Sequence, residues 1–321
     1  MSRLHNIVLL LLPALWLPAA FPSTEESAAR VWLTRMATAL HEQNYEGVFT
    51  YVRGGQFNTM QIVHRFKDGK EVERLLQLNG EKLEILRIDD ELVCYHEKSD
   101  HVDLEHHVPM GPFSSAFSEN LEAYQDLYRF SLHGDDRIAG RPAIKLGISP
   151  RFNDRYGYRL WLDKETGLLL QSHWLDIDQK RVREIFQFST VNIGNDIDES
   201  MLVSSLAGDA ISHRLGGEVV SLAKENTAKP NWRVAWLPNG FRSVRVPDSN
   251  RLHFTDGLAT FSVFIERSAK LSLPEMATHV DGTTVVITRR IKGLKGQITV
   301  VGGVPLATAR KVAASVEPVI Y

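Results

Sequence analysis

The chain has 321 residues, which is enough for two domains of ordinary size. Hydrophobic residues make up 43% and charged residues 24%, a composition typical of a globular protein rather than a disordered or fibrous one. A formal net charge of -2 excludes a broad cationic field for nucleic acid or anionic headgroups. The single cysteine, Cys94, excludes an intramolecular disulfide and any metal site built on several cysteines.

Residues 1–20 have the pattern of a secretory signal peptide. Arg3 is the only Lys, Arg, Asp or Glu among them. The apolar run Ile7–Leu17 is too short to span a bilayer, and the small residues Ala19 and Ala20 follow it. We therefore expect the segment to be removed on export, and the mature protein to reside in a bacterial periplasm.

The first element after this segment is a predicted helix, followed by a long run of strands. Trp32, Met36 and Leu40 recur at intervals of four, so residues 27–43 predict an amphipathic helix. From residue 46 the apolar period changes to two, and turn pairs such as Asn79-Gly80 separate the runs. The predicted strands cover residues 46–53, 57–66, 71–78, 83–88, 91–96, 143–148, 157–163, 168–175 and 181–191. This order predicts a mostly β, α+β protein in which a curved antiparallel sheet wraps on the helix.

A second unit follows a weakly patterned stretch. Glu119–Phe130 predicts a short helix inside the first unit, and residues 194–230 predict a linker because they lack periodicity. The strands expected after the linker cover residues 241–246, 251–255, 258–267, 283–291 and 297–301. A closing helix is expected from about Pro305. We therefore expect an N-terminal domain over residues 21–193 and a smaller C-terminal domain over residues 231–321.

The common catalytic motifs are absent from the sequence. It contains no G-x-S-x-G elbow, no phosphate-binding loop and no dinucleotide-binding glycine fingerprint. Four histidines lie in residues 96–107, but His96 and His101 are five residues apart, whereas a zinc-protease helix spaces its ligands by four. A polar loop is the favoured interpretation, with no metal, no cofactor and no catalytic residue. The alternative is a metal-dependent hydrolase that uses His96, His101, His106 and His107.

Large aromatic side chains gather at the start of the C-terminal domain. They are candidates for anchoring a partner peptide, because aromatic residues dominate the binding energy of many interfaces. The other interpretation is that a domain of this size needs them for its own core. The candidates are Trp232, Trp236, Phe241, Phe254 and Phe261.

Several strings, in order along almost the whole mature chain, resemble the RseB/MucB family. They are Gly47–Tyr51, Arg74–Gly80, Arg155–Asp163, Thr166–Leu168, Trp236–Phe241, Asp256–Glu266 and Thr299–Ala309. The resemblance implies a periplasmic negative regulator of the envelope-stress sigma factor σE or AlgU. It further implies that the chain binds the periplasmic domain of a membrane anti-sigma factor, RseA or MucA, and shields it from the site-1 protease.

The resemblance also implies a fold and a ligand. The N-terminal domain is expected to be an unclosed β-barrel with a helix packed inside, as in lipoprotein carriers of the LolA/LolB type. The C-terminal domain is expected to be a β-sheet with a helix that contributes to anti-sigma binding. Lipopolysaccharide or another acylated lipid is the expected releasing ligand. Self-association of the chain into a homo-oligomer stays open.

An apolar concave face offers a place for acyl chains, since each buried methylene is worth about 0.8 kcal/mol. Alternation along the strands does not say which face is concave, and a plain core role is the other interpretation of each residue. The same face also fits a second class of function, a periplasmic lipid or lipoprotein carrier without a regulatory partner. The candidate acyl-lining residues are Phe49, Tyr51, Met60, Ile62, Leu76, Leu78, Leu86, Ile88, Leu160, Leu162 and Leu169.

Overall fold

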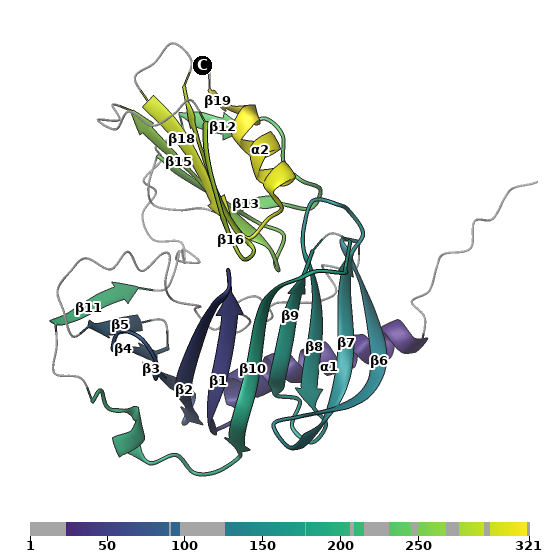
Figure 1. Cartoon of the computed structure of the whole chain (residues 1–321), viewed down its shortest axis with the longest axis vertical. Coiled ribbons are helices and arrows are strands. Elements are labelled where there is room, and N and C mark those ends of the chain that lie inside the picture. Colours follow the sequence, from purple (N-terminus) through teal and green to yellow (C-terminus); the bar gives the residue numbers. More distant parts are fainter. Residues whose placement is uncertain are drawn as a thin grey trace, which may run out of the picture.

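Two β-rich domains make up the computed structural model of the chain, one on top of the other in Figure 1. The structure describes residues 24–89, 91–96, 126–176, 178–205, 209–214, 231–244, 250–267, 276–291 and 296–319. The expected signal peptide and residues 97–107 of the histidine-rich stretch lie outside these residues.

The larger domain is built on one antiparallel sheet of eleven strands. Their order across the sheet is β11-β5-β4-β3-β2-β1-β10-β9-β8-β7-β6, so the sheet ends at β11 and β6 and is not closed. This confirms the expected unclosed barrel. The strands are β1 (Tyr45–Arg53), β2 (Gln56–Lys67), β3 (Lys70–Gln77), β4 (Leu83–Ile88), β5 (Glu91–His96), β6 (Tyr128–Ile138), β7 (Arg141–Pro150), β8 (Gly157–Asp163), β9 (Leu169–Leu175), β10 (Val182–Ile193) and β11 (Asp209–Arg214).

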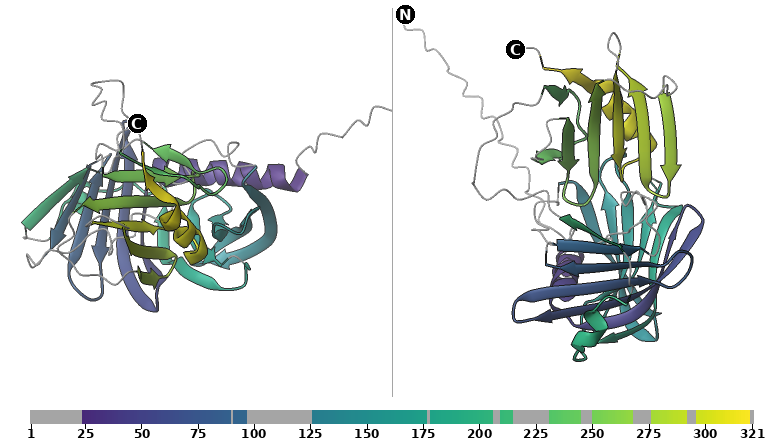
Figure 2. Two further views of the ribbon diagram at one scale, coloured as in Figure 1. Left: turned by 90° about the horizontal axis from the view of Figure 1, so that it is seen from above. Right: turned by 90° about the vertical axis from the view of Figure 1, so that its left-hand side faces the viewer.

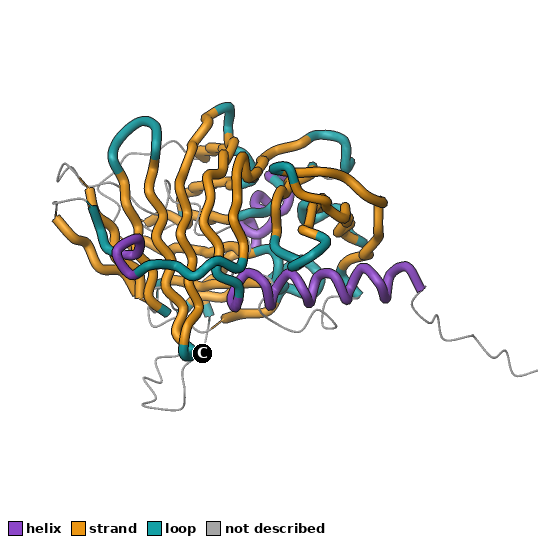
Figure 3. The backbone as a smooth tube through the Cα atoms, turned by 90° about the horizontal axis from the view of Figure 1, so that it is seen from below, coloured by secondary structure: helices purple, strands orange, loops and turns teal. Residues whose placement is uncertain are grey.

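Helix α1 (Thr24–Glu42) lies across one face of this sheet, which we call the inner face (Figure 3). Its fully buried residues, Ala29, Leu33, Met36 and Ala39, join the core of the sheet. Trp32 and Leu40 of the predicted stripe are only partly buried. The buried stripe therefore runs along Leu33 and Met36, with Trp32 and Leu40 at its margins.

The predicted helix over residues 119–130 is wrong at its C-terminal end. Tyr128 and Phe130 are the first residues of β6, with Arg129 exposed between them. That alternation has the strand period of two, and pairing with β7 satisfies the backbone. Residues 119–125 lie outside the described part of the chain.

The range predicted as a linker begins with folded structure. The 3-10 turn η3 (Glu199–Leu202) covers the outer face of the large sheet, where Ile197 and Leu202 pack on Val63. The buried Glu84 carboxylate accepts hydrogen bonds from the Ser204 hydroxyl and the Ser205 amide, both at 3.0 Å. Strand β11 then pairs with β5 at the sheet edge. The domain boundaries themselves stay predictions, because residues 215–230 lie outside the described residues.

The smaller domain is a six-stranded antiparallel sheet with a helix, as expected. The strand order is β13-β14-β15-β18-β17-β16, and helix α2 (Leu306–Ser315) packs on β17 and β18. Ala309 and Val312 join its core. Three short strands were not predicted: β12, β16 and β19. The strands are β12 (Trp232–Val234), β13 (Arg242–Val244), β14 (Arg251–Thr255), β15 (Thr260–Arg267), β16 (Met276–Asp281), β17 (Thr284–Arg290), β18 (Gly296–Gly302) and β19 (Val316–Pro318).

Among the described residues, no helix has both the length and the apolar character needed to cross a membrane.

The packing of α1 on the inner face predicts a stability difference between two positions of that helix. Replacing Leu33 by Ala is expected to lower the free energy of unfolding by about 2–5 kcal/mol, because it leaves a cavity in the core. The matched control is Val31→Ala, since the Val31 side chain is 68% exposed. Urea denaturation followed by circular dichroism measures both. Equal stability of the two variants contradicts the burial of this helix face.

Candidate functional site at the domain junction

Two hairpin turns of the smaller domain stand on one rim of the large sheet (Figure 2). One turn joins β14 to β15 and carries Asp256 and Leu258. The other joins β16 to β17 and ends at Thr283. Opposite them lie Arg155, just before β8, and Glu184 in β10. We call this region the junction.

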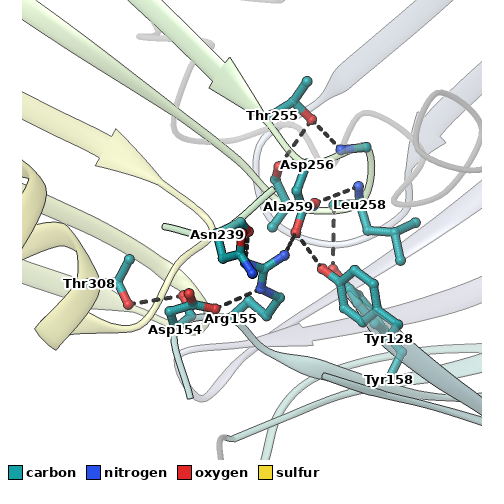
Figure 4. Close-up of polar contacts among 11 residues, drawn as sticks. Tyr128, Asp154, Arg155, Tyr158, Asn239, Thr255, Asp256, Leu258, Ala259 and Thr308 are labelled. Atoms are coloured by element: carbon teal, nitrogen blue, oxygen red, sulfur yellow. Dashed lines mark hydrogen bonds and ion pairs between the residues drawn. The ribbon is translucent and has the colours of Figure 1, made fainter. Parts of the chain in front are cut away.

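The first contact centres on a buried ion pair between Arg155 and Asp256 (Figure 4). The Arg155 side chain is 0% exposed. It donates to the Asp256 carboxylate, to the backbone oxygen of Asn239 and, at 2.7 Å, to Asp154. Tyr128 donates its hydroxyl to the same Asp256 oxygen at 2.8 Å. Removing either charge leaves the other one buried without its partner, which is strongly destabilising.

The electrostatics of this contact keep Arg155 charged and Tyr128 protonated. Burial acts to lower the pKa of Arg155, but the carboxylates of Asp154 and Asp256 outweigh it and raise that pKa. Burial, followed by the charge of Asp256, raises the pKa of Tyr128 well above its usual value. Tyr128 therefore stays a hydrogen-bond donor at every physiological pH.

The turn itself is held rigid by its own aspartate. Asp256 Oδ1 accepts from the backbone amides of Leu258, at 2.9 Å, and Ala259, at 2.7 Å. Leu258 leaves its own domain and is buried in the core of the large sheet. Tyr158 donates its hydroxyl to the Leu258 carbonyl at 3.4 Å. The Leu258 side chain and the Asp256 carboxylate, both from this turn, thus pack into the larger domain together.

Further contacts surround the ion pair. The Arg155 guanidinium lies over the Phe241 ring, 5.1 Å from its centroid. The Thr308 hydroxyl, in the first turn of α2, donates to the Asp154 carbonyl at 2.9 Å. Gly240 has a positive φ of 79° and packs against Leu127, which leaves no room for a side chain.

The second contact centres on Glu184, a carboxylate of the larger domain that is buried against the smaller one. It accepts from both the amide and the hydroxyl of Thr283, each at 2.6 Å. Tyr51 also donates to Glu184, and burial together with that carboxylate raises the pKa of Tyr51. Arg53 pairs with Asp281 at 3.0 Å. The junction is therefore held at two separate points.

Four of the strings that resemble the RseB/MucB family meet at this junction, although they are far apart in the sequence. Arg155, Asn239, Asp256 and Thr308 each come from a different one. No sequence pattern assigned these residues a role. Arg155, Asn239 and Asp256 each lie within two residues of a glycine in the sequence, but only the fold shows that these residues touch.

The candidate acyl-lining residues separate into two groups. Seven lie in the core on the inner face, namely Phe49, Tyr51, Met60, Ile62, Leu160, Leu162 and Leu169. Leu76 and Leu86 point to the outer face, because each follows a residue of the core, Leu75 or Ile85, along its strand. Leu78 and Ile88 are 48% and 43% exposed. Four of the eleven are therefore not brought together with the rest, and lipid contact stays a prediction for the whole set.

The candidate aromatic anchors of the smaller domain pack against one another. Trp232, Phe241, Phe254 and Phe261 are buried in its core, and Trp236 is partly buried against it. The Phe261 ring lies 5.2 Å from Phe241 and 5.1 Å from Phe254. This placement favours the core interpretation, and a direct partner contact for these residues stays a prediction.

Groups for metal or thiol chemistry are not gathered in the part of the chain that the structure describes. No set of three or more His, Cys, Asp or Glu residues there is arranged to hold a metal ion. His101, His106 and His107 lie outside the described residues, so the geometry does not test the hydrolase alternative. Burial raises the pKa of Cys94 to about 11, which keeps the thiol protonated.

Close approach at the second contact predicts a glycine requirement. Gly282 has a φ of 56°, and a Cβ there would overlap the Glu184 carboxylate. We expect Gly282→Ala to cost about 1–3 kcal/mol more than Gly69→Ala, because the hydrogen bonds of Glu184 must break. Gly69 is the matched control, since its φ is 75° and a Cβ added there would have no atom within 4 Å. Thermal unfolding compares them, and equal losses contradict the contact.

Comparison with known proteins places the chain in a family. The family profiles described as the MucB/RseB N-terminal and C-terminal domains match residues 28–206 and 226–317. The sigma factor AlgU regulatory protein MucB of Pseudomonas aeruginosa is 37% identical over 93% of this chain and 94% of its own length.

Two solved structures are similar over both domains. The MucA/MucB complex of Pseudomonas aeruginosa has a TM-score of 0.73 at 34% identity, covering 92% of this chain and 100% of that one. A structure of MucB has a TM-score of 0.66 at 33% identity, covering 93% and 100%. The two family profiles, the sequence identity and the shared two-domain architecture agree, and the chain belongs to the MucB/RseB family.

Proposed function

We propose that this chain binds the periplasmic domain of a membrane anti-sigma factor of the MucA kind and so restrains an envelope-stress sigma factor. The observation that carries the proposal is the similarity to a MucA/MucB complex over 92% of the chain, both domains included. A match to only one of the two domains would cover much less of the chain. The periplasm is the proposed location, in agreement with the signal-like residues 1–20.

The protein acts by occupancy and not by catalysis. The bound regulator covers the segment of the anti-sigma factor that the site-1 protease must reach. Proteolysis therefore begins only after the regulator is released. The buried charges at the junction, Arg155, Asp256 and Glu184, are each satisfied by partners within the protein. A structural role for them agrees with a protein that binds a partner.

Release by an acylated lipid is the second part of the proposal. The inner face supplies an apolar core that includes Phe49, Met60 and Ile62 on one side and Leu160 and Leu162 on the other. A lipid releases the partner only if it binds the free regulator better than the bound one. The C-terminal domain favours the regulator over the alternative of a simple lipid carrier, because a carrier does not need it.

Competition between partner and lipid tests this proposal. The mature chain is expected to bind a fluorescent MucA-type periplasmic domain, and lipopolysaccharide is expected to displace it. The experiment measures fluorescence anisotropy during titration of each ligand. A protein that binds lipid but never the anti-sigma domain is a carrier, and the regulatory proposal is then wrong. Binding of the domain without displacement at saturating lipid rejects only the release step.

A further inference from the structure

The two contacts of the junction lie on different strands, and this separation has a mechanical consequence. Arg155 precedes β8, whereas Glu184 lies in β10, on the far side of β9 in the sheet order. A single contact leaves two domains free to turn about it. Two contacts on different strands fix the angle between the domains as well as their distance.

The contacts are also reciprocal. Asp256 comes from the smaller domain and is buried against Arg155 and Tyr128 of the larger one. Glu184 comes from the larger domain and is buried against Thr283 of the smaller one. Each carboxylate loses water when the domains meet, and only this arrangement gives it the hydrogen bonds from the other domain that replace that water. Any other orientation leaves buried polar groups without partners, so one orientation is selected.

The turn that carries Asp256 is held by hydrogen bonds of its own as well as by the larger domain. Asp256 Oδ1 holds the amides of Leu258 and Ala259, while its Oδ2 faces Arg155 and Tyr128. One side chain therefore both builds the turn and attaches it. Leu258 adds an apolar contact inside the core of the other domain. Little ordering is left for the moment of contact, which lowers the entropic cost of holding the domains together.

A relative with its partner bound matches this chain across both domains. The MucA/MucB complex covers 92% of the chain at 34% identity and a TM-score of 0.73. We propose that Arg155, Asp256 and Glu184 are positioning residues, which hold the two domains in the orientation that binds the anti-sigma partner. This inference rests on the proposed function and adds that partner affinity depends on the junction.

The test measures the distance between the domains and the partner affinity in the same full-length variants. Spin labels are attached at Lys67→Cys in the larger domain and Arg310→Cys in α2, both exposed positions. Cys94 is buried, with a thiol pKa of about 11, so it stays unlabelled.

The test variants are Asp256→Asn and Glu184→Gln. Their matched controls are Asp163→Asn and Glu84→Gln, which remove buried carboxylates paired with Arg141 and Arg74 inside the larger domain.

The junction variants and the control variants are expected to give different results. The wild type and both controls give one narrow distance distribution, whereas the junction variants give a broad one and bind the MucA-type domain about tenfold more weakly. Circular dichroism checks that each variant folds. Thr283→Val removes only the hydroxyl donor to Glu184, so we expect it to broaden the distance distribution and weaken partner binding to a smaller extent.

Other outcomes overturn the inference. Junction variants with a narrow distribution show that these residues do not set the orientation. A broad distribution with unchanged affinity shows that the partner does not depend on the orientation. Failure of the wild type to bind the MucA-type domain at all refutes the proposed function instead, while the distance measurement still reports on the junction.

Discussion

The buried pair of Arg155 and Asp256 is the interaction on which the two-domain structure depends. A charge with no exposed surface is tolerated only when its partners are in place, and here those partners come from both domains. The guanidinium belongs to the larger domain, but two of its acceptors, the Asp256 carboxylate and the Asn239 carbonyl, belong to the smaller one. The larger domain therefore carries a buried cation that is fully satisfied only when the smaller domain is seated on it.

The smaller domain also completes the apolar core of the large sheet. A closed barrel pairs every strand, whereas this sheet ends at β11 and β6 and wraps on α1 to bury its inner face. At the rim, the core is completed by Leu258 from the smaller domain. The junction therefore lies against the apolar core of the larger domain.

Sequence reasoning predicted the parts of this structure that local periodicity encodes. Nine strands of the large sheet, the long first helix and the closing helix are all present close to their predicted positions, because alternation and turn pairs such as Asn79-Gly80 are local signals. The spacing within residues 119–130 predicts a helix at Tyr128, and only pairing with β7 decides for the strand. Likewise, alternation alone did not show that Leu76 and Leu86 face outward.

The candidate site could not be predicted from local signals. Thr308 and Asp154 are 154 positions apart and meet only through the fold, as do Arg155 and Asp256. The strings that contain these residues identified the family, yet no pattern in one sequence tells which of them touch.

The central claim is that the buried ion pair makes the two domains unfold as one unit. Calorimetric unfolding tests this claim most directly. The account predicts a single cooperative transition for the wild type and two separate transitions for Asp256→Asn, since the domains then lose their coupling. Two independent transitions in the wild type, unchanged in Asp256→Asn, would contradict it.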